Sequence, residues 1–349
     1  MSELPDIQAD AGRAQGAQVH ESAEEEVAEP VAPAAKTSEP VVPAAPPRVR
    51  KFNLIGRRNI FFAISLLVII PGIVSMWHNH FLLGIDFRGG TEITATFDSH
   101  PSIAQVTDAV NKEGLDGSVI QTTGGGYILR YPPLNAAQTH NVQADLQNRL
   151  GHMNVSQILS VGGTIAGETI ELSVLAVVLA AVAILLLLAI RFRNVPGGWR
   201  AGFQFGGSAL AALLHDVFVL TGLFSIFGTV FNWQVGEINA YFVTAVLTVV
   251  GFSVHDTIVV FDRIRENLRV SQRLSFEQVV NLSVMQTAAR SIITSFTVVL
   301  VLAAIFISGQ PSLQGLALAL LIGIVSGTYS SIFNAAPLLV VWRRLQPLR

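Results

Sequence analysis

Two His-Asp pairs inside otherwise apolar stretches are the residues with the clearest capacity for chemistry. They are His215-Asp216 and His255-Asp256. A charged group within an apolar segment long enough to cross a membrane is costly, so it is a candidate functional residue by default. A carboxylate that has lost its hydration in such a segment can load and unload a proton. The two pairs are therefore candidates for proton transfer inside a membrane.

Asp256 is the stronger candidate of the two carboxylates. It lies six residues before Asp262, which with Arg263 begins the charged stretch at the end of its apolar segment. We therefore expect Asp256 in the inner half of the bilayer, with Ser253 on the same helical face. The charged stretch Asp262–Arg273 is expected to form an amphipathic helix on the membrane surface.

Arg290 is the predicted partner of Asp256, because it opens the next apolar segment at a depth that could match. An arginine keeps its proton in proteins, so its role would be electrostatic. It would stabilise ionised Asp256 in one conformation and move away in the other. The alternative is that Arg290 is one more arginine at the inner interface, with its head among the lipid headgroups.

The pair His215-Asp216 has two readings. It could act as a proton relay, or it could be two polar groups hydrogen-bonded between helices. The repeated His-Asp pairs could also suggest a metal site, but no third ligand lies at a suitable spacing and there is no H-E-x-x-H motif. We expect no metal and no cofactor.

These side chains require membrane-spanning helices to position them. The chain is 51% hydrophobic and 13% charged, against about 25% charged in an average soluble domain. Six apolar segments are long enough to span a bilayer. They run from Ile60 to Trp77, Leu172 to Ile190, Ala209 to Phe227, Ile238 to Phe261, Ser291 to Ile307 and Leu313 to Val341. The net charge of -2 argues against a nucleic-acid partner, and the absence of Cys excludes thiolate chemistry.

Arginine placement predicts the orientation of the helices. If the N-terminus is cytoplasmic, the inside segments carry the arginine clusters of 48–58, 191–200, 263–273 and 343–349, whereas the short outside loops 228–237 and 309–312 carry no Lys or Arg. Both termini are then inside. The predicted parts are a disordered tail (1–50), a basic flank with the first helix (51–77), an outside domain (78–167), a five-helix bundle (168–342) and an inside C-terminus (343–349).

The outside segment 78–167 has its own periodicity. It predicts strands and helices in the order βαββαβ, which is the ferredoxin-like arrangement. The predicted elements are Thr91–Phe97, Ser102–Gly114, Val119–Thr123, Tyr127–Tyr131, Ala136–Leu150 and Val155–Val161. The chain is therefore expected to be an α-helical membrane protein with six spanning helices and an α+β domain between helices one and two.

Two glycine patterns are expected to be structural. The sequence Gly84-Ile85-Asp86-Phe87-Arg88-Gly89-Gly90 joins the first helix to the first strand, where the glycines permit a tight turn that Asp86 and Arg88 could fix by hydrogen bonds. In the last apolar segment, small residues recur every four positions and predict a close helix-packing face. They are Gly315, Ala319, Gly323 and Gly327.

In these stretches the chain resembles the SecF family of protein-export subunits. The resemblance covers residues 52 to 345 and rests on GIDFRGG, LLHDV, GFSVHDTIVVFDRIREN, NLSVMQTAARSIITS and SIFNAAPLL, in that order and spacing. The family usually has Asn before the membrane Asp, where this chain has His255. A titratable imidazole there could influence Asp256 or join the proton path.

The resemblance implies a bacterial inner-membrane subunit that pairs with SecD and acts with the SecYEG channel on translocating preproteins. It makes Asp256 a proton-translocating carboxylate and Arg290 its functional partner, with proton flow driving late, ATP-independent translocation. The alternative is half of an RND-type exporter of small molecules or lipids, although the outside domain is small for a substrate pocket. No activated nucleophile is present to suggest an enzyme.

Overall fold

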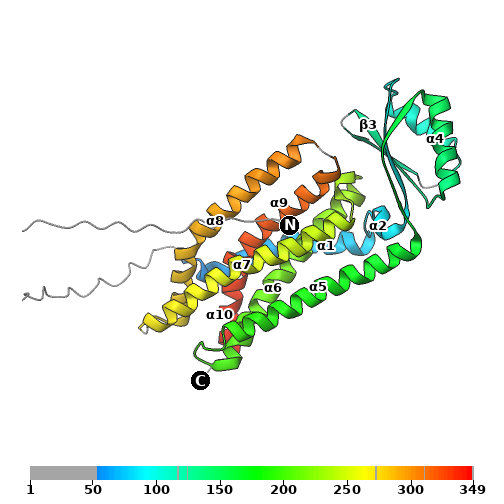
Figure 1. Cartoon of the computed structure of the whole chain (residues 1–349). Helices are drawn as coiled ribbons and strands as arrows, with labels where there is room; N and C mark the ends of the chain where they lie inside the picture. The colour runs from blue at the N-terminus through cyan, green and yellow to red at the C-terminus, as the bar shows by residue number, and fades with distance from the viewer. Residues whose placement is uncertain (1–52, 116–117, 124, 272, 310, 348–349) are drawn as a thin grey trace, which may run out of the picture. The chain divides into compact units, whose positions relative to one another are not determined.

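The computed structural model describes residues 53–115, 118–123, 125–271, 273–309 and 311–347 (Figure 1). Within these residues, six helical spans are long and apolar enough to cross a membrane. They are Ile55–His78, Gly163–Arg191, Gly198–Val230, Ala240–Val270, Phe276–Ser308 and Leu313–Leu345. The predicted six-helix class is confirmed. The predicted disordered tail, 1–50, lies outside the described residues.

The helices are α1 (Arg58–His78), α5 (Gly163–Arg191), α6 (Gly198–Ser225), α7 (Ala240–Val270), α8 (Phe276–Ser308), α9 (Pro311–Ser330) and α10 (Ala336–Leu345). Two π-helical turns interrupt the pattern: η2 (Ile226–Val230) follows α6, and η4 (Ser331–Ala335) joins α9 to α10. A 3₁₀ turn, η1 (Ile55–Arg57), precedes α1, and another, η3 (Gln234–Gly236), precedes α7.

Two predicted boundaries were wrong because both helices continue through residues outside the predicted apolar segments. The stretch expected to lie on the membrane surface instead extends α7 without a break to Val270. Arg290 does not open its helix, because α8 begins at Phe276, where Ser275 and Gln278 form a reciprocal capping box. Arg290 therefore lies well inside α8.

Burial separates the spans into a centre and a periphery. The apolar windows of the third, fourth and sixth spans are 44%, 50% and 50% buried, whereas those of the first, second and fifth are 17%, 11% and 17% buried. Thus α6, α7 and α9–α10 form the centre of the bundle. The exposed faces of α1, α5 and α8 are apolar, as lipid-facing surfaces are.

Small residues allow the central helices to approach closely. A Cβ atom on Gly323 would lie 2.1 Å from Val249 Cγ2, and one on Gly327 would lie 3.0 Å from Ser253 Cβ. The small-residue stripe of α9, which also includes the fully buried Ala319, therefore lies against α7. Backbone contact of this kind sets how α7 and α9 face each other, and hence where their polar side chains point.

The segment between α1 and α5 folds as an α+β domain with its own hydrophobic core, Gly90–Val161, called the α/β domain below. Its strands β1 (Gly90–Phe97), β2 (Val119–Thr123), β3 (Gly126–Tyr131) and β4 (Met153–Val161) form one antiparallel sheet in the order β2-β3-β1-β4. Helices α3 (Ile103–Asn111) and α4 (Ala136–Leu150) supply Val106 and Leu146 to a core that includes Ile93 and Leu129. The predicted ferredoxin-like order is confirmed.

Candidate functional site

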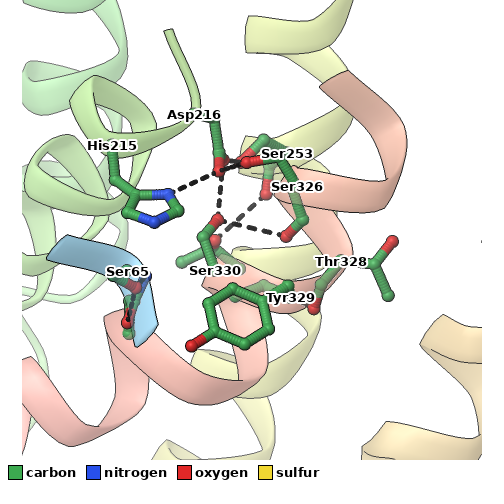
Figure 2. Close-up of polar contacts among 12 residues, drawn as sticks. Ser65, His215, Asp216, Ser253, Ser326, Thr328, Tyr329 and Ser330 are labelled. Carbon is green, nitrogen blue, oxygen red and sulfur yellow. Dashed lines mark hydrogen bonds and ion pairs between the residues drawn. The ribbon is translucent and has the colours of Figure 1, made fainter. Parts of the chain in front are cut away.

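A cluster of polar side chains surrounds Asp216 inside the bundle (Figure 2). Asp216 is on α6 and is 1% exposed. Its Oδ2 accepts hydrogen bonds from Ser253 Oγ (2.6 Å) and Ser330 Oγ (2.6 Å). Its Oδ1 lies 2.7 Å from the donating Ser326 Oγ and 3.0 Å from His215 Nδ1. We call these five residues the Asp216 cluster.

The Asp216 cluster joins the three central helices, because Ser253 comes from α7 and Ser326 and Ser330 come from α9. Each carboxylate oxygen has two partners, so the acceptor is well satisfied despite its burial. Sequence reasoning placed Ser253 beside Asp256 and overlooked the serines of α9. The available signal was their four-residue spacing, which puts two hydroxyls on one helical face.

His215 extends the cluster toward α1. Its ring stacks near Tyr329 at 6.1 Å between centroids, and Tyr329 donates its hydroxyl to the Phe61 carbonyl oxygen at 2.9 Å. A second contact between α1 and the last span joins Ser65 Oγ and Asn334 Nδ2 at 3.0 Å. Polar contacts therefore reach from α7 through α6 and α9 to α1.

Asp256 has the opposite environment. It is on α7 and is 4% exposed, yet its Oδ2 has no hydrogen-bond partner among the described residues. Ser291 lies beside it on α8 without meeting hydrogen-bond geometry, and its buried Oγ is also unpartnered within the described part of the chain. An unsatisfied buried carboxylate is costly to keep, which marks Asp256 as a group poised to take up another partner or a proton.

Arg290 and His255 both lie on the surface of the chain, whereas Asp256 is buried. Over the residues described, no ion pair joins Arg290 to Asp256. Arg290 accepts a hydrogen bond from Thr294 Oγ1 only through its backbone carbonyl, at 2.8 Å. Consecutive residues of a helix point in different directions, which is why His255 is exposed beside a buried neighbour. The pairing of Arg290 with Asp256 is absent in this conformation.

Asp262 and Arg263 connect the far end of α7 to its neighbours. Asp262 Oδ2 lies 2.9 Å from Arg191 Nη2 of α5. Arg263 donates to Gln286 Oε1 of α8 at 2.6 Å and pairs with Glu266 at 2.6 Å. These two residues therefore hold helices together and are not part of the buried site.

The glycine-rich entry to the α/β domain forms a short helix, α2 (Ile85–Arg88), followed by a turn. Gly89 has φ of +74° and Gly90 has φ of +156°, which only glycine adopts without strain. A Cβ on Gly90 would also lie 2.8 Å from the Tyr131 carbonyl oxygen. Phe87 is buried beneath the turn. The turn thus needs both glycines.

Asp86 does not fix this turn as predicted. Its Oδ2 accepts a hydrogen bond from the backbone N–H of Ala240, the first residue of α7, at 2.9 Å. A carboxylate at a helix N-terminus satisfies a free N–H and interacts favourably with the helix dipole. The glycine-rich motif is therefore connected directly to the helix that carries Asp256.

Among the described residues, no three His, Asp or Glu side chains converge as metal ligands. The described part of the bundle instead holds a hydrogen-bonded cluster at Asp216 and, on α7, a buried carboxylate oxygen of Asp256 without a hydrogen-bond partner. This arrangement is suited to moving a proton and to transmitting a helix movement.

Comparison with known proteins identifies the family. The family model "Protein export membrane protein SecD/SecF, C-terminal" matches residues 141–345, and the "SecD/SecF GG Motif" matches residues 74–99. The protein translocase subunit SecF of Thermobaculum terrenum is 41% identical over 310 residues, covering 85% of this chain and 96% of the relative. The corresponding subunit of Haemophilus influenzae is 35% identical, covering 80% of this chain and 82% of the relative.

A solved structure has the same fold. The crystal structure of SecDF from Thermus thermophilus, described as a translocon-associated membrane protein, matches 85% of this chain with a TM-score of 0.73 and 30% identity. The match covers 39% of that longer chain. With six apolar spans and these relatives, the chain belongs to the SecD/SecF family of protein export membrane proteins, as a multi-pass SecF-type subunit of the Sec export machinery.

Proposed function

We propose that this chain pairs with a SecD subunit in a bacterial inner membrane and couples proton flow to the late, ATP-independent stage of preprotein translocation. The SecDF relative, which carries more than this chain covers, supports a SecD partner. Its description as translocon-associated supports work alongside the SecYEG channel. The relatives are named as transport subunits, and we propose no enzymatic activity for this chain.

The observation that supports proton coupling is that one carboxylate oxygen of the buried Asp256 has no hydrogen-bond partner among the described residues. A proton carrier must lose its proton to one side and regain it from the other, so it must not be fixed by permanent hydrogen bonds. Asp256 meets this condition, because its buried Oδ2 has no partner among the described residues. Asp216, with four hydrogen bonds, does not.

We assign Arg290 an electrostatic role in a second conformation. It is exposed on α8, one residue before Ser291, which lies beside Asp256. A modest rotation of α8 against α7 would bring its guanidinium toward the carboxylate. The charge would then favour ionised Asp256 and release its proton.

The orientation is proposed from the arginines. The ends of α5, α7 and α10 carry Arg191, Arg269 and Arg344, whereas the loop between α6 and α7 carries no Lys or Arg. Positive residues concentrate on the cytoplasmic side, so both termini are inside and the α/β domain is outside.

The test uses membrane vesicles that hold this chain, a SecD subunit and the SecYEG channel. A precursor is stalled partway, ATP is removed, and completion is followed with and without a proton gradient. We expect gradient-driven completion in the wild type and none in Asp256→Asn. Glu266→Gln is the matched control and should complete transport as the wild type does, because it removes an exposed carboxylate from the same helix outside the buried site. Equal completion by Asp256→Asn and wild type would refute Asp256 as the proton carrier.

A further inference from the structure

The segment that leads into the α/β domain is joined by backbone hydrogen bonds to the residues just before α7. The Ile238 N–H donates to the Leu82 carbonyl at 2.8 Å, and the Gly84 N–H donates to the Ile238 carbonyl at 2.9 Å. Together with the bond from the Ala240 N–H to Asp86, they place the entry of the domain against the start of α7. We call this contact the α7 joint.

One arginine crosses from the sheet to the α7 joint. Arg130, on β3, lies with its Nε 2.8 Å from Glu92 Oε2 on the adjacent strand β1. Its Nη1 lies 2.6 Å from Glu237 Oε2, just before α7, and 3.4 Å from Gln234 Oε1. The planar guanidinium can serve both carboxylates at once because its donors point along fixed directions.

This ion pair is largely shielded from water. The side chains of Arg130 and Glu237 are 17% and 8% exposed, and that of Glu92 is 21% exposed. Gly84 of the glycine-rich motif makes room for Glu237, because a Cβ at Gly84 would lie 2.5 Å from Glu237 Oε1. Removing one partner of a buried ion pair destabilises a protein much more than replacing both partners, because the remaining buried charge is left without a partner.

The charges around Glu237 come from several elements. Burial raises the pKa of Glu237 to about 7, Arg130 opposes that rise, and Glu92 and Asp86 add to it. Arg88 lines the same small cavity as Arg130 and Glu237. Arg130 is thus the cation paired directly with two of these carboxylates, Glu92 and Glu237.

We propose that Arg130 is the positioning residue that holds the α/β domain on the N-terminal end of α7, the helix that carries Asp256. Without Arg130, Glu92 and Glu237 face each other with no cation between them, and the joint opens. With Arg130, a movement of the domain is transmitted to α7. The use of this connection in transport rests on the proposed function, whereas the connection itself does not.

Hydrogen–deuterium exchange of the full chain in lipid nanodiscs tests the joint directly. The backbone N–H groups of Gly84, Ile238 and Ala240 are protected only while the joint is closed. In Arg130→Met at pH 8 we expect their exchange to accelerate about a hundredfold, as loss of one partner of a buried pair implies. The strand amides of Ile93 and Leu129 should exchange as in the wild type, which shows that the domain is folded.

Two further variants separate positioning from general damage. Arg149→Met removes another arginine of the same domain, whose ion pair with Glu113 stays within the domain, and it should leave the joint amides unchanged. The double variant Arg130→Met/Glu237→Gln should recover most of the lost protection, because it removes the unpaired charge. Lowering the pH from 8 to 6 should likewise protect Arg130→Met, after correction for intrinsic exchange, because Glu237 takes up a proton.

The proposal would be overturned if the amides of Gly84, Ile238 and Ala240 exchanged in Arg130→Met at the wild-type rate while the strand amides of Ile93 and Leu129 kept their protection. Failure of the double variant to recover any protection would also overturn it. The measurement needs no proton gradient, so its outcome is independent of whether Asp256 carries protons.

Discussion

Replacing Asp216 with Asn tests whether the Asp216 cluster holds the central helices together. The substitution keeps the shape of the side chain but replaces one acceptor oxygen with an NH₂ donor. Whichever way the amide faces, two of the four groups that meet Asp216 lose their acceptor. They then face an NH₂ donor, and a serine hydroxyl there can accept from it only by turning its own proton to another acceptor.

The expected loss follows from those two hydrogen bonds. Side-chain hydrogen bonds between membrane helices average about 0.6 kcal/mol, and bonds to charged groups are worth about 1.5 kcal/mol or more. Asp216→Asn should therefore lower the free energy of unfolding by about 1 to 3 kcal/mol. Ser330 Oγ also lies 3.2 Å from the Gly327 carbonyl oxygen, so it can turn to that acceptor and keep the loss near the lower limit.

The assay is reversible unfolding of the purified subunit pair in mixed micelles, followed by helical circular dichroism. Ser208→Ala is the matched control, because Ser208 is buried on the same helix and its Oγ has no partner among the described residues. The control should change stability by less than about 0.5 kcal/mol. In double-mutant cycles, Ser330→Ala or Ser326→Ala, whichever removes the serine that faces the new NH₂ group, should cost much less in Asp216→Asn than in the wild type. Equal stabilities for Asp216→Asn and Ser208→Ala would refute the structural role of the cluster.

Three other predictions concern packing, pH and the arginine of α8. In the same unfolding assay, Gly323→Ala should destabilise the bundle by about 1 to 3 kcal/mol, because its Cβ would meet the side chain of Val249. Gly251→Ala is the control and should be neutral or stabilising, because the space around Gly251 is open. As the pH rises from 4.5 through 7, the wild type should lose on the order of 3 kcal/mol of stability relative to Glu237→Gln, because the folded protein holds the proton of the Glu237 carboxyl more tightly than the unfolded chain does. A stability difference that does not change with pH would contradict the raised pKa of Glu237. Arg290→Ala should abolish gradient-driven completion of transport and Arg290→Lys should impair it partly, and normal transport by Arg290→Ala would favour an interfacial role.

Local sequence patterns were enough to predict the membrane spans and the order of strands and helices in the α/β domain. The six spans follow from the length of the apolar segments, and the ferredoxin-like order follows from short periodic runs separated by turns. The helix ends were harder. Polar residues extended α7 to Val270 and started α8 at Phe276, because charged and capping residues are compatible with a helix that has left the apolar region.

The sequence by itself picked out His215-Asp216 and His255-Asp256 as costly groups in apolar segments, but it could not rank their environments. Only the tertiary structure decided that Asp216 is satisfied by Ser326 and Ser330, 110 and 114 residues further along the chain. It likewise decided that Asp256 is left without a partner among the described residues. The reason is physical: a hydrogen bond between helices depends on their rotation and separation. Those are set by close packing at positions such as Gly323, and not by the residues that form the bond.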